Sequence, residues 1–385
     1  MRERLRVFFA MLIGGAVVLP GRAQFVENAV EFLTLHPNER AVARDSTIYP
    51  AKIVLAPIIT YAPETSLGLG VGAKYLFKFR GSGDETRTSN MPISVTYTFN
   101  NQFILGSGYE IFFNQERAVL TGNFRYSVFP QFFYGVGRRT PDSNEEEFSY
   151  SRLLFEPLLG WQTPINHLFV GGGPRYNQVW GVEFGRDDGI LATGGLPGAG
   201  GSRAVGLSFA ALFDSRDNLL NAYRGWYALF THGVYGEYIG SNFNFQRTVL
   251  DLRTYVRPIE RRQDVLAFQF LAQMTWGDVP VVELAALGGS EMMRGYYEGR
   301  FRDRSLLAFQ MEYRRRITGR LGMVAFAGLG EVSPTIGDFD LGFVEPSVGF
   351  GLRFLIERRE RLNLRFDWGF GRNTNNYYFQ VSESF

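Results

Sequence analysis

The chain has 385 residues, of which 45% are hydrophobic and 20% are charged, a balance that excludes both an intrinsically disordered protein and a bundle of membrane helices. Its 16% aromatic content and 45 glycines are typical of many strands joined by tight turns. A net charge of only +2 gives no electrostatic basis for binding nucleic acid, and the absence of cysteine removes thiol chemistry and disulfides.

The first 23 residues have the pattern of a secretory signal peptide. Three arginines within the first six residues precede the apolar stretch Val7–Leu19, and the small residue Ala23 suits cleavage before Gln24. A membrane anchor is the alternative, but the apolar stretch is shorter than the ~20 residues that a spanning helix needs. We therefore expect residues 1–23 to be removed on export.

Residues 24–50 form a short segment ahead of the main body. Apolar residues within Phe25–Arg40 recur at a roughly helical spacing, which predicts a short periplasmic helix. A leader without regular structure explains the same residues equally well. Both interpretations remain open from the sequence.

From residue 51 to residue 385 the hydrophobic period becomes two. Within Leu362–Phe370 every even-numbered residue is apolar, while the odd-numbered residues include Asn363, Arg365 and Asp367. Residues of one parity, even or odd, lie on the same face of a strand. The same split recurs over residues 248–256, 266–274 and 306–316. In Leu306–Arg316 it predicts that Phe309 and its parity partners face lipid while Gln310, Arg314 and Arg316 face inward.

Segment length and number indicate a membrane barrel. Alternation alone also fits a soluble sandwich, but we count roughly sixteen segments of about 9 to 13 residues, the length of a tilted membrane strand. The predicted fold is all-β: one transmembrane antiparallel β-barrel spanning residues 51–385.

Connection lengths give the barrel a predicted orientation. With Ile53–Tyr61 as the first upward strand, one side receives short turns and the other receives long, polar, glycine-rich loops near residues 129–147, 181–202, 277–304 and 331–343. Short turns are typical of the periplasmic side. The chain ends at Phe385 after a series of alternate apolar residues that Glu383 interrupts, which resembles the terminal aromatic signal of outer-membrane barrels.

Three motifs resemble a known family. Leu287–Tyr296, followed by Gly299–Asp303 and Glu312–Arg314, is similar to the sixth outer loop and next strand of the BamA/TamA-like bacterial surface antigen superfamily. Phe213–Asn218 looks like the periplasmic turn of that family, and residues 56–72 look like its opening strands. The resemblance covers the barrel from about residue 50 to the end.

The resemblance implies a loop tip, Arg294, Gly295 and Tyr296, that folds back into the barrel lumen. A guanidinium removed from water needs carboxylate partners, and Glu312 on the next strand is the predicted one. The family has a second acidic residue where this chain reads Ala325–Gly328, so we consider Asp367 as its substitute.

The turn motif comprises Asp214, Arg216, Asp217 and Asn218. We interpret it as a turn that satisfies its own hydrogen bonds through Asx geometry. A calcium site is the alternative, but the spacing of the acidic residues matches no calcium loop.

The resemblance implies insertion of proteins into the bacterial outer membrane or translocation across it. Family members carry periplasmic POTRA domains of about 75 residues, and none fits between Gln24 and the barrel. We therefore expect a separate periplasmic or outer-membrane partner in addition to membrane lipid. A passive channel or structural barrel is the alternative, and a barrel enzyme is less favoured, since no catalytic, cofactor or metal residues emerge from the sequence.

Overall fold

The computed structural model describes residues 34–37, 39–45, 48–83, 86–259, 264–358 and 361–385. The predicted signal peptide and most of the predicted helix over residues 25–40 lie outside these ranges. In the described part of that helix, Thr34–Leu35 is instead a short strand, β1, and a helix, α3, covers Glu39–Arg44. The difference has a tertiary cause, because β1 forms a ladder with the first barrel strand.

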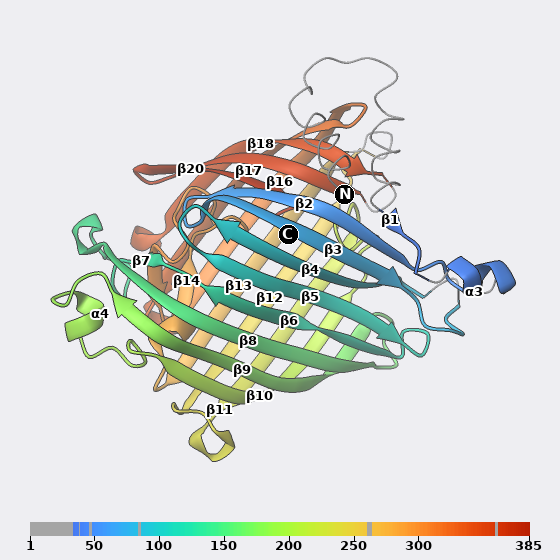
Figure 1. Ribbon diagram of the computed structural model, residues 1–385. Helices are drawn as coiled ribbons and strands as arrows, with labels where there is room; N and C mark the ends of the chain where they lie inside the picture. The colour runs from blue at the N-terminus through green and yellow to red at the C-terminus, as the bar shows by residue number, and fades with distance from the viewer. Residues whose placement is uncertain (1–33, 38, 46–47, 84–85, 260–263, 359–360) are drawn as a thin grey trace.

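Sixteen antiparallel strands form one closed barrel, in agreement with the fold predicted from the sequence (Figure 1). The barrel strands are β2 (Lys52–Ala62), β3 (Ser66–Phe77), β4 (Ser89–Thr98), β5 (Phe103–Phe113), β6 (Ala118–Val128), β8 (Glu146–Gln162), β9 (Leu168–Phe184), β10 (Ser202–Asp214), β11 (Gly225–Tyr235), β12 (Phe245–Val256), β13 (Val265–Gly277), β16 (Ser305–Thr318), β17 (Leu321–Ser333), β18 (Glu345–Glu357), β19 (Leu362–Gly371) and β20 (Thr374–Val381).

Short elements occupy the connections. They are β7 (Gln131–Phe133), α4 (Ile190–Thr193), β14 (Ala285–Leu287), β15 (Phe301–Asp303) and the 3-10 turns η1 (Asp142–Asn144), η2 (Glu237–Ile239), η3 (Val281–Glu283), η4 (Ile336–Asp338) and η5 (Leu341–Phe343). Within the described residues, no helix combines the length and apolarity required to cross a membrane.

Side-chain parity follows the sequence pattern. On β16, Phe309 is 42% exposed while its neighbour Gln310 is 2% exposed, so the apolar parity faces outward and the polar parity faces the barrel interior. Arg314 is buried on the inward face as predicted. Arg316 is exposed, because it lies at the end of the strand and donates to Gly319 O in the turn.

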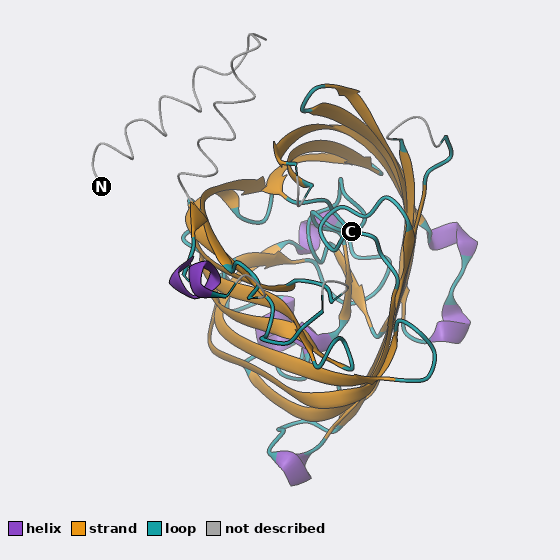
Figure 2. Cartoon of the chain, turned by 90° about the vertical axis from the view of Figure 1, so that its right-hand side faces the viewer, coloured by secondary structure: helices purple, strands orange, loops and turns teal. Residues whose placement is uncertain are grey.

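The two ends of the barrel differ in their connections. The long ones, residues 129–145, 185–201, 278–304 and 334–344, all lie at the same end, and the tight turns after β5, β8 and β16 lie at the other. In Figure 2 loop segments fill much of the outline of the ring of strands, and the end of the chain lies within that outline.

The barrel closes where its first and last strands meet, and we call this junction the seam. Strand β2 pairs with β3 at eleven positions from Lys52 to Ala62, whereas β2 pairs with β20 at a single position, Tyr61 with Phe379. Strand β1 pairs with Ile53 and Val54 of β2. Because β3 already occupies the other edge of β2, β1 lies on the seam edge.

Candidate functional site

The loop between β13 and β16 presents the predicted tip. Strands β14 and β15 pair at its base, so that residues 288–300 project as a single lobe. Met293 and Tyr296 pack with Leu287 against Leu306 and Val332 in one buried apolar cluster. The loop is therefore anchored to the barrel wall by its own side chains before any charge is considered.

Arg294 lies at the centre of the site and is completely buried. Its guanidinium forms an ion pair with Glu312 of β16 and donates to Asp367 Oδ2 of β19 at 2.5 Å. The same group lies 3.6 Å from the centre of the Phe326 ring. The structure thus places Arg294 against the partner expected from the sequence and also against Asp367, the substitute that we considered for the missing acidic residue.

Further charges surround this pair. Arg314 donates to Glu312 at 2.7 Å, Arg353 forms an ion pair with Asp367, and Arg353 also donates to Glu383 at 2.7 Å. We call the buried set Arg294, Glu312, Arg314, Arg353, Arg365, Asp367 and Glu383 the lumenal network. Each carboxylate contacts at least one guanidinium, the arrangement that a buried charge requires.

Sequence reasoning did not assign Arg353 or Glu383 to the site. The available signal was parity. Arg353 lies on the inward face of β18, and Glu383 follows the end of β20. Parity shows which side chains face inward, but it does not give the register along the barrel axis between strands that are distant in the chain. It therefore could not show which inward-facing side chains meet.

Two glycines allow the loop backbone to approach the wall closely. Gly295 has φ +112°, and a Cβ there would lie 2.7 Å from the carbonyl carbon of Phe370. A Cβ on Gly369 of β19 would lie 2.6 Å from the carbonyl carbon of Arg294. At both positions glycine is required because backbone meets backbone.

Tyr296 completes the tip. Its hydroxyl donates to Glu345 Oε2 at 2.9 Å and accepts from Arg372 N at 2.7 Å. Burial raises the pKa of this hydroxyl, so it remains a neutral donor. Tyr296 therefore links the tip to the start of β18 and to the turn after β19. Both lie at the barrel end that carries the long loops.

A second contact joins the same loop to the opposite side of the seam. Glu298 N donates to Glu64 Oε1 at 2.5 Å, and Glu64 lies in the turn between β2 and β3. Gln102 Nε2 donates to Glu64 O at 2.6 Å and fixes that turn. Gly295 N of the loop also donates to Tyr378 Oη of β20, so the loop contacts β20 on one side of the seam and the β2–β3 turn on the other.

We expect the contact between Glu64 and the loop to weaken as pH rises. Burial, assisted by the Glu298 carboxylate, raises the pKa of Glu64 from 4.5 to about 8. Because the folded state binds this proton more tightly, the stabilisation is fully present below pH 4.5 and is lost as pH rises through about 8. Protease cleavage within residues 278–304 should increase between pH 6 and pH 9, and Glu64→Gln should remove that increase. An equal increase in Glu64→Gln would contradict this assignment.

The predicted turn motif lies at the other end of the barrel. Arg216 pairs with Asp214 through two nitrogens, and Asp217 Oδ1 accepts from Tyr223 N at 2.8 Å. Asn218 Oδ1 accepts from the main-chain nitrogens of the turn. Most of its groups are satisfied locally, as the Asx interpretation requires. Two outside arginines also contact it, Arg87 at Asp214 and Arg361 at Asp217.

Phe385 is buried and lies outside β20, which ends at Val381. Its ring belongs to a cluster with Ala222, Tyr255 and Val265 near the turn motif. The aromatic residue predicted as a barrel signal is thus held on the inner side of the wall here.

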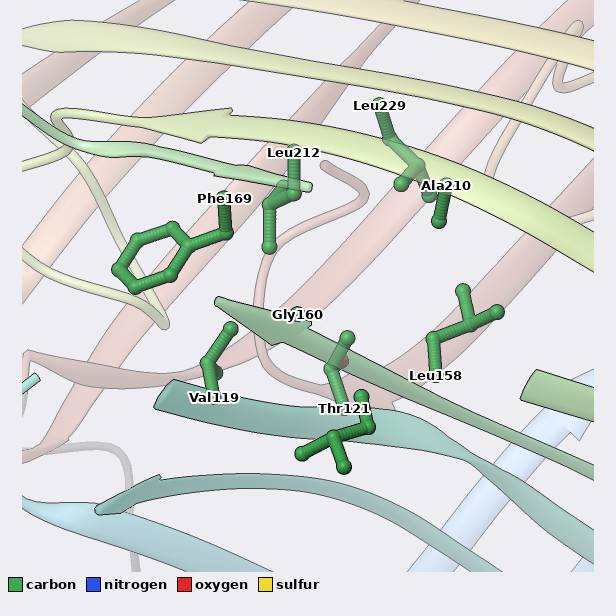
Figure 3. A pocket seen from close by; sticks show the side chains of 9 residues that line it. Val119, Thr121, Leu158, Gly160, Phe169, Ala210, Leu212 and Leu229 are labelled. Carbon is green, nitrogen blue, oxygen red and sulfur yellow. The ribbon is translucent and has the colours of Figure 1, made fainter. Parts of the chain in front are cut away.

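One cavity away from Arg294 is mainly apolar. The pocket drawn in Figure 3 lies between β6, β8, β9, β10 and β11 and is lined mainly by aliphatic side chains and Phe169. Among the described residues, no group of three His, Asp or Glu side chains is positioned to hold a metal ion. The charged contacts around Arg294 therefore remain the candidate site.

Comparison with known proteins adds a family match. Residues 196–385 match the Omp85 superfamily domain. No curated protein matches the chain in sequence. The barrel is similar to BamA from Haemophilus ducreyi lacking POTRA domains 1-3, with a TM-score of 0.55 and 13% identity over 86% of this chain and 70% of that one. It is also similar to CdiB from Acinetobacter baumannii, with a TM-score of 0.56 and 11% identity over 87% of this chain and 60% of that one.

Proposed function

This chain carries an Omp85 superfamily domain within a bacterial outer-membrane β-barrel, and we propose that it inserts proteins into the outer membrane or translocates them across it. The family and the fold support such a role in outline. The chain spans 70% and 60% of the two similar barrels, so its own substrate and partners are part of the proposal.

The seam is the observation that carries the proposal. A single paired position joins β2 to β20, whereas β19 pairs with β20 at eight positions. Each missing pair removes main-chain hydrogen bonds that would otherwise resist separation of the two strands. A barrel that must release or admit a polypeptide sideways needs one junction that opens more easily than the others, and only the seam has this property among the described strand pairs.

The loop supplies a gate for this seam. We propose that residues 278–304 fold into the lumen and plug it, held by Arg294 on one side and by Glu64 on the other. Gly295 supports this role, because its nitrogen donates to Tyr378 Oη at 3.0 Å and its oxygen accepts from Asn376 at 2.8 Å, both on β20. Opening the seam would then require the loop to shift.

A separate periplasmic protein would deliver the substrate. Between Thr34 and β2 the described residues contain only β1 and α3, which leaves no receiving domain in that part of the chain. Our proposed organisation is a signal peptide at residues 1–23, a short periplasmic segment at 24–50 and the barrel at 51–385.

Cross-linking the seam tests the proposal. The chain has no cysteine, so Tyr61→Cys with Phe379→Cys introduces the only two thiols at the one paired position. In liposomes containing the chain, oxidation should slow the assisted folding of another outer-membrane barrel by roughly tenfold or more, and a reductant should restore the rate. Ala211→Cys with Phe230→Cys, a paired position of β10 and β11, is the matched control and should have no effect.

Full activity of the oxidised seam variant would contradict the proposal. A chain that conducts ions in planar bilayers but never accelerates folding, oxidised or reduced, would instead support the passive-channel alternative.

A further inference from the structure

The inner face of the barrel wall carries four arginines on strands that lie far from the seam in the strand order. They are Arg125 on β6, Arg152 on β8, Arg175 on β9 and Arg247 on β12, and we call them the arginine wall. Arg125 pairs with Leu154, which makes Arg152 its diagonal neighbour on the same face of the sheet. Positive charges are thus gathered on one part of the lumen.

Two carboxylates pair with the arginine wall in the described part of the chain. Arg175 Nε donates to Glu156 Oε2 of β8 at 2.9 Å, and Arg175 Nη1 donates to Glu283 Oε1 at 2.8 Å. Arg152 instead donates to Asn177 Oδ1 at 2.9 Å. Four guanidinium groups therefore face two carboxylates, and the excess positive charge favours a further anion.

Glu283 does not belong to the wall. It lies in η3, at the start of the loop that carries Arg294, and is 3% exposed. Asn177 Nδ2 donates to its Oε1 at 2.5 Å, and Gln273 Nε2 donates to its main-chain oxygen at 3.4 Å. The wall thus contacts both the side chain and the backbone of Glu283, as it would contact an acidic residue within any polypeptide.

The arginine wall also has donors and space for a second anion. Arg247 Nη2 donates to Gln273 Oε1 at 3.3 Å, but Arg247 Nε is buried and lacks a hydrogen-bond partner among the described residues. Arg125 and Asn123 are exposed although they share the inward parity of the buried Val119. Solvent therefore reaches this part of the lumen, and so can a ligand.

We infer that the arginine wall binds acidic segments of polypeptide inside the lumen, and that Glu283 occupies this site while the loop is in place. The planar fork of arginine suits carboxylates, and rings of arginine are known to favour anions in pores. A shift of the loop would withdraw Glu283 and expose Arg175 and Asn177 to the lumen. The inference rests on the proposed function and deepens it, because it names acidic stretches as the substrate class.

Calorimetric titration of the full chain in an uncharged detergent tests this inference. The probe is hexaglutamate with both ends blocked, and the main variant is Glu283→Gln, which removes the charge with little change in side-chain size. We expect Glu283→Gln to bind the probe roughly tenfold more tightly than the unsubstituted chain, because a tethered carboxylate no longer competes for Arg175. The affinity should fall as salt is added, since the contacts are between charges.

Matched variants separate the site from general charge. Glu237→Gln removes an exposed carboxylate from the outer loop between β11 and β12 and should leave the affinity for hexaglutamate unchanged. In the Glu283→Gln chain, Arg175→Gln should abolish the gain, whereas Arg203→Gln, which changes an exposed arginine on the outward parity of β10, should preserve it. Hexalysine should bind none of these chains.

Equal affinity of the Glu283→Gln and unsubstituted chains for hexaglutamate would overturn the inference. So would an equal gain for free glutamate, because the site would then take small carboxylates instead of polypeptide. If Glu283→Gln does not fold, Glu283→Asp, which withdraws the carboxylate from Arg175 and Asn177, should still give a gain of about threefold. Binding in detergent requires no opening of the seam, so failure here is distinguishable from failure of the seam cross-linking test.

Discussion

Arg294→Ala is expected to release residues 278–304 from the barrel while leaving the barrel folded. The substitution removes the ion pairs with Glu312 and Asp367 and the contact with Phe326. Breaking a buried pair typically costs about 3 to 5 kcal/mol. For Arg294→Ala we expect a cost at the lower end of this range, because Glu312 keeps its ion pair with Arg314 and Asp367 keeps its ion pair with Arg353. Strand pairing does not depend on Arg294, so only the loop contact is lost.

Limited proteolysis and conductance measure this release. A loss of about 3 kcal/mol raises the open population on the order of a hundredfold, so cleavage within residues 278–304 should accelerate by a similar factor while heat-modifiable gel mobility is retained. Single-channel conductance should rise. Arg304→Ala is the matched control in the same loop, because Arg304 is exposed and exposed charges contribute about 0 to 1 kcal/mol.

Two outcomes would contradict the Arg294 prediction. If Arg294→Ala does not assemble, the tip takes part in folding and cannot be separated from the barrel. If cleavage and conductance both stay unchanged, the loop does not plug the lumen.

Gly369→Ala should release the same loop without removing any charge. The added Cβ would lie 2.6 Å from the carbonyl carbon of Arg294 and 2.7 Å from Gly295 N, closer than real contacts allow. Strand β19 is paired on both edges, so the loop backbone must move instead. Overpacking of this kind costs about 1 to 3 kcal/mol, which predicts roughly 5- to 150-fold faster cleavage within residues 278–304.

Gly106→Ala is the control for Gly369→Ala. Gly106 lies on β5, and the nearest heavy atom to its added Cβ would be Ser94 Oγ at 3.8 Å, an ordinary contact. This variant should keep the cleavage rate of the unsubstituted chain. If the two glycine variants behave alike, close backbone approach at Gly369 does not hold the loop, and the charges around Arg294 act without it.

Much of the architecture is encoded locally. Alternation within Leu362–Phe370 and Leu306–Arg316 determines which side chains face outward, because successive residues of a strand point to opposite faces. Turn residues and loop lengths separate the strands and distinguish the two ends. For that reason the strand number, the parity of β16 and β19 and the grouping of long connections at one end were all predictable from the chain.

The partners of Arg294 were only partly predictable. Glu312 lies 18 residues away on the strand that directly follows the loop, so chain proximity and parity identified it. Asp367 lies 73 residues away, and its contact depends on the stagger between β16 and β19. This stagger is the sum of the register shifts over every strand pair between β16 and β19, so it cannot be predicted from any local sequence pattern.

Tertiary structure alone decided the seam and the course of the chain after Val381. The pairing of β1 with Ile53 and Val54 requires an edge of β2 that β20 leaves unoccupied. Strand β20 pairs with β2 only at Tyr61, and after Val381 the chain turns inward, where Arg353 and Glu312 hold the residues that follow. Periodicity identifies which residues can form a strand, but which edges stay unpaired depends on the closed barrel as a whole, since closure brings together strands from opposite ends of the sequence.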